Sequence, residues 1–309
     1  LKNQISSGSF HANSFVNIDE NKRVLFFTAN GVESSIDPYY EHLYSINLNG
    51  TGLRNLNKGD FTSSTIMADS NKYFVSNFSR VNMAPKSELR TNTGALVLSL
   101  EKADLSQLMS TGYKFPEPFK MKADDGFTDI YGVIYRPYDF DKNKKYPLIE
   151  YVYPGPQTEA VSKSFSLRMN RTDRLAQLGF IVVTLGNRGG HPARSKWYHN
   201  YGYGNLRDYG LADKKRIAEQ LADKYAYINL DKVGIFGHSG GGFMSTAAML
   251  VYPDFFKVAV SSSGNHDNTM YNSWWSETHH GVMEEIGEDG NLNYNYQIDV
   301  NQSLASKLK

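Results

Sequence analysis

One segment restricts the fold of this chain more than any other: a glycine-rich turn that joins an apolar strand to a helical stretch. The run Val233–Phe236 leads directly into Gly237-His-Ser-Gly-Gly-Gly242, and residues 241–252 then have helical spacing. A G-x-S-x-G motif between a strand and a helix is typical of the sharp turn that lifts a nucleophilic serine above a sheet. We therefore predict that Ser239 is a nucleophile and that the surrounding sheet belongs to an α/β domain.

The residues next to Ser239 fit this chemistry. Glycine is needed at Gly237 and Gly241, because side chains there would collide with the neighbouring strand and helix. The backbone N–H of Gly240 opens a helix, where the helix dipole favours negative charge. We expect it to stabilise the oxyanion that forms when a serine attacks a carbonyl. The alternative is that these glycines serve only the packing of the helix on the sheet.

From Pro116 onward, short apolar runs alternate with stretches of helical spacing. The expected strands are residues 131–135, 148–152, 180–184, 232–236 and 258–261, and the expected helices are residues 166–178, 209–225 and 241–252. This alternation predicts a mostly parallel sheet with helices on both faces. Together with the glycine-rich turn it indicates the α/β hydrolase class, in which active sites lie at the carboxyl ends of the strands.

The first 112 residues have a different pattern, in which short strand-like runs are separated by turn formers. The runs are residues 24–28, 43–47, 73–76 and 95–98, and no long helical period occurs before Lys102. This spacing suits β-propeller blades, of which about two or three would fit, whereas a closed propeller needs about four or more. We therefore predict that residues 1–114 are the C-terminal part of a β-propeller and residues 115–309 the N-terminal part of an α/β-hydrolase catalytic domain. The alternative for the first part is a small independent β-domain.

Composition excludes several kinds of site and partner. The chain has 309 residues and no cysteine, which excludes disulfides, zinc thiolates and a cysteine nucleophile. The net charge is +1 and no basic run is interleaved with aromatic residues, so nothing favours nucleic acid. No apolar run approaches the roughly 18 residues that span a bilayer, so we expect no membrane span. We also expect no metal or organic cofactor.

The sequence does not reveal the base that would activate Ser239. In this fold class the triad follows the order Ser, Asp or Glu, His, and both partners follow later strands. No further parallel strand is evident beyond Val258, Asp267 and Asp289 do not follow a buried strand, and His238 should diverge from its neighbour on a strained turn. The remaining candidates are interpreted as loop histidines without identifiable partners: His191, His199, His279 and His280. We predict that the chain stops before the triad Asp and His and is inactive, or nearly so, alone.

With the turn, the upstream strands and an aromatic segment taken together, the chain resembles the prolyl oligopeptidase family, and most of all its dipeptidyl peptidase IV branch. The resemblance is strongest over residues 146–281. Tyr151-Val-Tyr-Pro-Gly-Pro156 is similar to the family segment whose tyrosine hydroxyl completes the oxyanion hole, which implies that role for Tyr153. The position agrees, because Tyr153 ends a strand where an oxyanion donor belongs. The alternative for Tyr153 is a packing role.

The segment Asn265–Gly281 resembles the part of the family that builds the specificity pocket. The resemblance implies that Tyr271 and Trp275 wall an apolar slot for proline or another small residue before the cleaved bond. A flat aromatic wall suits the rigid apolar face of a proline ring. Trp275 stands where the family has a second tyrosine, which would narrow or reshape the slot. The alternative is that Tyr271, Trp274 and Trp275 are ordinary interface aromatics.

Three further segments are compared with the family pattern. Gly186-Asn-Arg-Gly-Gly190 resembles the family's Asp-Gly-Arg-Gly loop but departs from it at the first two positions, and we interpret it as structural. The acidic lead Asp208–Asp213 resembles the family's approach to the helix before the elbow, where acids suit a helix N-terminus. The elbow has His238 and Gly240 where the family more often has Trp-Ser-Tyr, which leaves the nucleophile intact but alters its surroundings.

The resemblance implies a serine peptidase that releases N-terminal dipeptides through an acyl-enzyme on Ser239, with proline or alanine preferred at the penultimate position. It implies a peptide substrate, a periplasmic or extracellular location and often a homodimer. The glutamates that capture a free amino terminus in the family would lie upstream of Leu1, so dipeptide release rests on the resemblance alone. The alternatives are an acyl-peptide hydrolase or oligopeptidase, an esterase on the same fold, and a non-catalytic binding module.

Overall fold

The computed structural model describes residues 3–154, 158–166, 172–204 and 209–296, together with Asn301 and Leu304. The chain divides into two compact units, which we describe separately. One unit comprises Leu1–Pro116, Ser162–Arg168 and Ala193–Ser195, and the other comprises Glu117–Val161, Met169–Pro192 and Lys196–Lys309.

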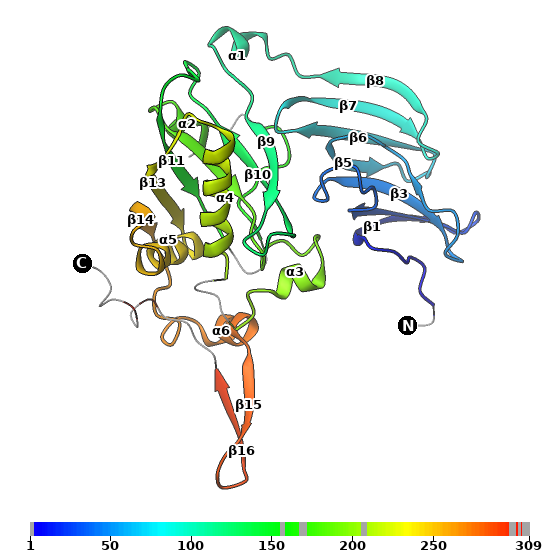
Figure 1. Cartoon of the computed structure of the whole chain (residues 1–309). Coiled ribbons are helices and arrows are strands. Elements are labelled where there is room, and N and C mark those ends of the chain that lie inside the picture. The colour runs from blue at the N-terminus through cyan, green and yellow to red at the C-terminus, as the bar shows by residue number, and fades with distance from the viewer. Residues whose placement is uncertain are drawn as a thin grey trace. The chain divides into compact units, whose positions relative to one another are not determined.

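The N-terminal unit contains two four-stranded antiparallel sheets, drawn in blue and cyan in Figure 1. Both sheets pair their strands in sequence order, as consecutive hairpins do. The strands are β1 (His11–Asp19), β2 (Val24–Asn30), β3 (Glu41–Asn47) and β4 (Arg54–Asn55) in one sheet, and β5 (Thr62–Met67), β6 (Tyr73–Arg80), β7 (Met83–Thr91) and β8 (Leu96–Lys102) in the other. A short helix, α1 (Ser106–Ser110), follows. The unit is therefore rich in β-structure, as predicted, and its assignment to a propeller stays a prediction.

Alternating side chains of β2 and β3 build two separate cores in this unit. Phe26 and Leu43 pack with Leu56 and with Phe74 of β6, so this core includes side chains from both sheets. Phe27, the next residue along β2, belongs instead to the other core, with three further buried residues: Ala29, Tyr44 and Ile46. Successive side chains of a strand point to opposite faces, so a strand that is apolar at adjacent positions is buried on both.

The C-terminal unit is built on a six-stranded mixed sheet with the strand order β14-β13-β11-β12-β10-β9. Four neighbouring strands are parallel, and β9 and β10 pair antiparallel at one edge. The strands are β9 (Glu117–Lys122), β10 (Asp129–Tyr135), β11 (Tyr146–Tyr151), β12 (Ile181–Leu185), β13 (Ile228–His238) and β14 (Phe256–Ser262). Because parallel strands end at the same edge, the carboxyl ends of β11, β13 and β14 lie side by side.

The helices of this unit are α2 (Thr172–Ala176), α3 (Lys196–Asn200), α4 (Leu211–Lys224), α5 (Gly240–Val251) and α6 (Ser273–His280). Leu211, Ile217 and Leu221 on α4 are fully buried in the main core, as their helical spacing requires. Of the helix expected at residues 166–178, the structure describes α2 (Thr172–Ala176); Ser166 is not helical, and residues 167–171 lie outside the described part of the chain. Of the helices that are described, none is long and apolar enough to cross a membrane.

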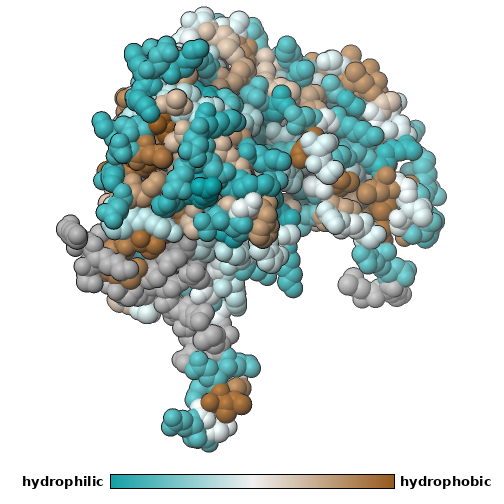
Figure 2. All heavy atoms as spheres, viewed as in Figure 1, coloured by the Kyte–Doolittle hydropathy of each residue, from teal (hydrophilic) through white to brown (hydrophobic). Residues whose placement is uncertain are grey.

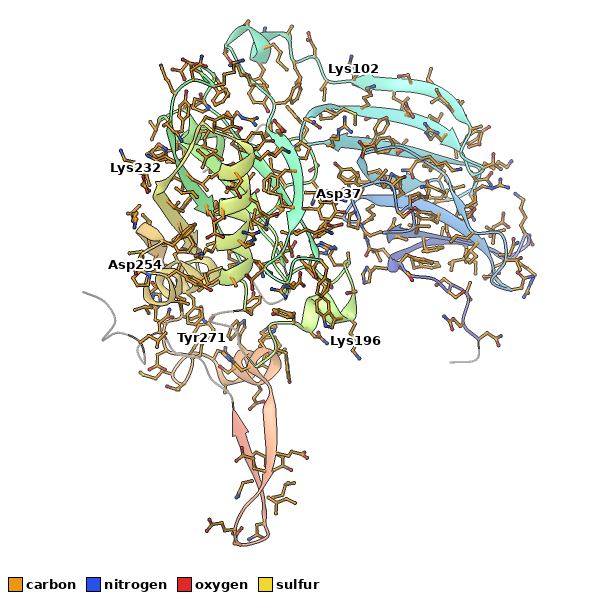
Figure 3. All side chains as sticks on the ribbon, viewed as in Figure 1. Asp37, Lys102, Lys196, Lys232, Asp254 and Tyr271 are labelled. Atoms are coloured by element: carbon orange, nitrogen blue, oxygen red, sulfur yellow. The ribbon has the colours of Figure 1, made fainter. Side chains whose placement is uncertain are left out.

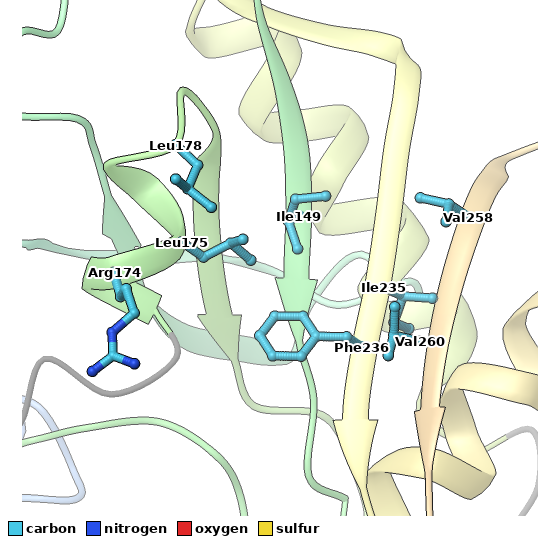
Figure 4. A pocket seen from close by; sticks show the side chains of 8 residues that line it. All are labelled: Ile149, Arg174, Leu175, Leu178, Ile235, Phe236, Val258 and Val260. Carbon is cyan, nitrogen blue, oxygen red and sulfur yellow. The ribbon is translucent and has the colours of Figure 1, made fainter.

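One face of the parallel strands carries apolar side chains that remain accessible (Figure 4). A pocket of about 340 Å³ lies there and is lined by Ile149, Arg174, Leu175, Leu178, Ile235, Phe236, Val258 and Val260. Val258 and Val260 on β14 are 53% and 61% exposed in the part of the chain that the structure describes. Leu175 and Leu178 come from α2 and the turn after it, which cover this face beside β11 and β12 (Figure 4).

The chain also forms a projecting hairpin that the sequence analysis missed. It consists of β15 (Val282–Ile286) and β16 (Leu292–Tyr296), which form a separate two-stranded antiparallel sheet among the described residues (Figure 1). Ile286 and Leu292 are cross-strand partners and are 80% and 50% exposed, and hydrophobic side chains are visible at the tip in Figure 2. The Asp289-Gly290 dipeptide is a turn signal that could have revealed this hairpin.

Candidate active site

The turn between β13 and α5 has the backbone geometry of a nucleophile elbow. Ser239 has φ 56° and ψ −121°, and it lies directly between the last residue of β13 and the first of α5. A non-glycine residue at positive φ is uncommon and costs about 1–3 kcal/mol, so the surrounding structure must hold it in place. Two backbone hydrogen bonds do so: Ser239 N–H donates to Ser262 O at 2.8 Å, and Phe243 N–H donates to Ser239 O at 3.0 Å.

Close backbone contacts explain the glycines of the turn. A Cβ on Gly237 would lie 2.3 Å from the carbonyl oxygen of Val152, and one on Gly241 would lie 2.1 Å from the same oxygen. A Cβ on Gly242 would lie 2.5 Å from the carbonyl oxygen of Ser262. The elbow is therefore wedged between the ends of β11 and β14. Any side chain at these three positions would displace it.

The predicted oxyanion donors lie at this wedge. Gly240 is the first residue of α5, so its N–H is one of the helix N–H groups without an intrahelical acceptor. Tyr153 follows β11, and its Cα lies 3.5 Å from the position that a Cβ on Gly241 would take. The structure thus brings the backbone of Tyr153 beside the elbow. The role of its hydroxyl stays a prediction.

No histidine is hydrogen-bonded to the Ser239 hydroxyl within the described residues. His238 instead directs Nδ1 to the Ser262 hydroxyl at 2.9 Å, in keeping with the expected divergence of adjacent side chains. The candidate acids are engaged in local turns: Asp267 accepts from Thr269, and Asp289 accepts from Asn291.

Three of the other histidines lie in helices rather than in loops, so that part of the sequence analysis was wrong. His199 belongs to α3, where its Nδ1 lies 2.7 Å from the carbonyl oxygen of Gly190. His279 and His280 belong to the last turn of α6. The residues that the structure describes contain no cluster of three or more side chains that could hold a metal ion.

The aromatic residues expected to form the specificity pocket meet at α6. Tyr271 and Trp275 pack edge to face, with ring centroids 5.6 Å apart and planes at 82°. Tyr271, labelled in Figure 3 beside α6, is 54% exposed, and Trp274 is 71% exposed. Asn272 begins the helix, because its side-chain oxygen accepts from Trp275 N–H. A cavity of about 520 Å³ adjoins this helix, and its lining includes His199, Tyr203 and His279.

Comparisons with known proteins match both parts of the chain. The family described as "Prolyl oligopeptidase family" matches residues 165–305, and the one described as "Dipeptidyl peptidase IV (DPP IV) N-terminal region" matches residues 1–85. The chain belongs to the prolyl oligopeptidase family. Within that family it is like the dipeptidyl peptidase IV group, and the matched ranges support an α/β-hydrolase part that follows a propeller-type part.

Three similar proteins are each longer than this chain. Dipeptidyl peptidase 8 of Homo sapiens is 28% identical over 281 residues, which cover 88% of this chain and 31% of that protein. The Mus musculus protein of the same name is 33% identical over 174 residues, 56% of this chain and 19% of that protein. A crystal structure from Bacteroides ovatus, described as a candidate dipeptidyl aminopeptidase IV, is 25% identical with a TM-score of 0.75, and the match covers 90% of this chain and 39% of that one. The chain thus spans less than half of each.

The loop that departs from the prolyl oligopeptidase family pattern is anchored by ion pairs. Arg188 donates through Nη2 to Asp213 at 2.6 Å and through Nη1 to Asp125 at 3.2 Å, and its guanidinium lies over the ring of Tyr201. Asp213 is fully buried in the first turn of α4. Both observations agree with the structural interpretation of the loop. Of the acidic lead, Asp208 lies outside the described residues.

The C-terminal unit contains a buried acid on β11 and a buried base on α4, and the sequence analysis missed both. Glu150 on β11 is fully buried, and burial raises its pKa to about 8, against the opposing effect of the Lys214 charge. Burial lowers the pKa of Lys214, and its ammonium donates to Leu185 O at 3.0 Å. The signals were available: Glu150 interrupts an apolar strand, and Lys214 lies on the apolar side of α4, three residues after Leu211.

Proposed function

We propose that the full-length gene product containing this chain is a serine exopeptidase that releases N-terminal dipeptides, with proline or alanine preferred at the penultimate position. The observation that carries the proposal is the strained backbone of Ser239 between β13 and α5, with glycine required on both sides. A strained backbone of this kind persists only where the surrounding structure enforces it, and such residues are concentrated at active sites. The similarity to dipeptidyl peptidases supports the reaction class.

The mechanism would be acyl transfer. The Ser239 hydroxyl attacks the scissile carbonyl, and the Gly240 N–H and the Tyr153 hydroxyl donate to the oxyanion of the tetrahedral intermediate. A histidine takes the serine proton and returns it to the leaving amine, and water then releases the dipeptide from the acyl-enzyme. We propose that this histidine and its aspartate lie beyond Lys309, and that the chain alone is inactive or nearly so.

Selectivity for a small residue would come from the aromatic pair at α6. Tyr271 and Trp275 stand at 82° to each other and so offer two apolar walls. A proline ring presents a rigid apolar face, so burying it against such walls needs little ordering of the ligand. Trp275 is larger than the tyrosine that the family resemblance would place there, which favours ligands no larger than proline or alanine.

The resemblance also motivates a proposed setting. We propose a periplasmic or extracellular location and a homodimer for the full-length gene product. Cell fractionation and analytical ultracentrifugation test these two proposals. Recovery in the cytoplasm, or a monomer at micromolar concentration, would refute them.

A pair of substrates tests the proposed reaction on the full-length gene product. One is Gly-Pro-anilide with a free amino terminus, and the other is its N-acetylated twin. Release of the anilide from the free form only, and its loss in Ser239→Ala, is the expected result. Cleavage of both would indicate an oligopeptidase or acyl-peptide hydrolase, and cleavage of neither together with turnover of a simple ester would indicate an esterase.

A further inference from the structure

A second serine lies beside the elbow and does contact a histidine. Ser261, the second-to-last residue of strand β14, has its hydroxyl 3.2 Å from Nε2 of His266. Nδ1 of the same ring lies 3.0 Å from the side-chain nitrogen of Asn301. Asn301 is 3% exposed, and its backbone N–H donates to His266 O at 2.9 Å. These contacts join the end of β14 and the residues just after it to Asn301, which lies 35 positions beyond His266.

The directions of the hydrogen bonds determine which ring nitrogen of His266 carries the proton. The Asn301 amide nitrogen also donates to Phe243 O at 3.1 Å, so turning the amide over would set two oxygens against each other. With its nitrogen towards the ring, Asn301 donates to Nδ1. A neutral imidazole then carries its proton on Nε2 and donates it to the Ser261 hydroxyl, which in turn donates to Gly242 O at 2.8 Å.

This arrangement excludes His266 as a base for Ser261. A general base needs a lone pair towards the hydroxyl that it deprotonates, and here that nitrogen carries the proton. The chain of donors leads instead to two backbone carbonyls, Gly242 O and Phe243 O. Both belong to the first turn of α5, which begins immediately after Ser239.

The first turn of α5 must be stabilised by contacts from other segments. Gly240, Gly241 and Gly242 are consecutive, and glycine loses more conformational freedom on folding than any other residue. Close approach to Val152 and Ser262 requires glycine at the last two of these positions. The turn therefore has no side chains of its own to hold it before Phe243, whose ring stacks on His266 with centroids 6.4 Å apart.

We propose that His266 is a positioning residue for the nucleophile: with Ser261 and Asn301 it fixes the first turn of α5, and thereby the Gly240 N–H and the backbone of Ser239. This inference rests on the proposed function of Ser239. The side chains that contact His266 in the described residues belong to α5, to β14 and to Asn301, and none of them is charged. The neighbouring carboxylate of Asp267 is directed to Thr269. Burial lowers the pKa of His266, which agrees with a neutral ring.

Nuclear magnetic resonance on the intact chain tests the proton position without any assay. Long-range proton–nitrogen correlation of the imidazole should show His266 as the Nε2–H tautomer at pH 7. Asn301→Asp replaces a donor with an acceptor, so it should move the proton to Nδ1 and raise the pKa of His266. An Nδ1–H tautomer in the unsubstituted chain, or no change in Asn301→Asp, would overturn the proposal.

Kinetics on the full-length gene product tests the positioning role. His266→Leu should lower kcat about tenfold with KM within about twofold, because a misplaced reacting group costs rate rather than binding. His266→Gln should restore most of kcat, since its amide can accept from Asn301 and donate to Ser261. The matched control is His11→Leu, which replaces a half-buried histidine of the N-terminal unit and should change neither constant. An unchanged kcat in folded His266→Leu refutes the positioning role, whereas turnover in Ser239→Ala refutes the proposed function instead.

Discussion

Ser239 and Ser261 stand on neighbouring elements at the same edge of the sheet, and the protein holds them in opposite ways. Ser239 is held by its backbone, at φ 56° between glycines, with no histidine bonded to its hydroxyl in the described residues. Ser261 lies in a regular strand and has an imidazole 3.2 Å from its hydroxyl. The serine that has a histidine beside it is therefore the one that the hydrogen-bond directions exclude as a nucleophile. Backbone strain and proton position therefore identify a nucleophile better than distance to a histidine.

Replacing each serine with alanine should reveal the largest difference between Ser239 and Ser261. In the full-length gene product, Ser239→Ala should lower kcat roughly 10⁴- to 10⁶-fold, as removal of a nucleophile does. Ser261→Ala should lower kcat by about tenfold at most, because it removes only one support of the elbow. Steady-state hydrolysis of Gly-Pro-anilide measures both. Comparable losses in the two variants would contradict the distinction.

Glu150 and Lys214, which are both fully buried, should affect stability through each other. Lys214→Met removes the charge that opposes the raised pKa of Glu150 and loses the hydrogen bond to Leu185 O, for a cost of about 1–3 kcal/mol. Replacing both residues, as Glu150→Leu with Lys214→Met, should restore the free energy of unfolding to within about 1–2 kcal/mol. Urea unfolding measures the three variants. Additive losses in the double variant would mean that the two groups do not interact.

The Lys214→Met variant should also show a more pronounced pH dependence of stability than the unsubstituted chain, with a known sign. The pKa of Glu150 is raised from 4.5 to about 8 in the folded chain, and loss of the Lys214 charge removes the effect that opposes this shift. The folded state then binds the proton more tightly than the unfolded state does. The free energy of unfolding should be highest below about pH 4.5 and fall as the pH rises to 8. A variant that is equally stable at pH 5 and pH 8 would contradict this account.

A glycine-to-alanine substitution should reduce stability more in the elbow than in an ordinary glycine turn. A methyl group at Gly241 would lie 2.1 Å from Val152 O, so Gly241→Ala should cost about 3 kcal/mol or more. Gly126→Ala is the matched control, because Gly126 has φ +78° but open space around it and should cost only about 1 kcal/mol. Thermal unfolding distinguishes the two. Equal costs would mean that the elbow can relax.

Removal of the Asn301 amide should have the smallest effect on the free energy of unfolding. Asn301→Ala removes the hydrogen bonds to Phe243 O and to His266, for a loss of about 1–3 kcal/mol. Burial lowers the pKa of His266 below 6.5 in the folded chain, so its contribution is present at higher pH and is lost as the pH falls below 6.5. His266→Leu should flatten the pH profile of stability in that range. An unaltered profile would contradict the described contacts.

The sequence predicted the elements around Ser239 because local and long-range signals agree there. An apolar run, a glycine pattern and a helical period all point to strand, turn and helix, and β13 and α5 lie within a few residues of the expected positions. The prediction was less complete around α6. The family resemblance indicated that aromatic residues there line a specificity pocket, but no sequence pattern indicated the helix that begins after Asn272. The short β15–β16 hairpin had only its Asp289-Gly290 turn as a signal.

The contacts that support the elbow could not be predicted in the same way. His266 and Asn301 are 35 positions apart, and only the fold brings the ring nitrogen within 3.0 Å of the amide. A lone histidine after a strand has many possible partners, and sequence periodicity does not select one. Glu150 and Lys214 were in principle visible as polar residues at apolar positions, but which acid faces which base depends on the order of the strands.

Covalent labelling gives the most direct test of Ser239 as nucleophile. The full-length gene product would be treated with a fluorophosphonate, which reacts with activated serines, and the adduct would be mapped by peptide mass spectrometry. We predict a single adduct on the peptide that contains Ser239, and no labelling of Ser239→Ala. An adduct on Ser261, or equal labelling of the Ser239→Ala variant, would contradict the account.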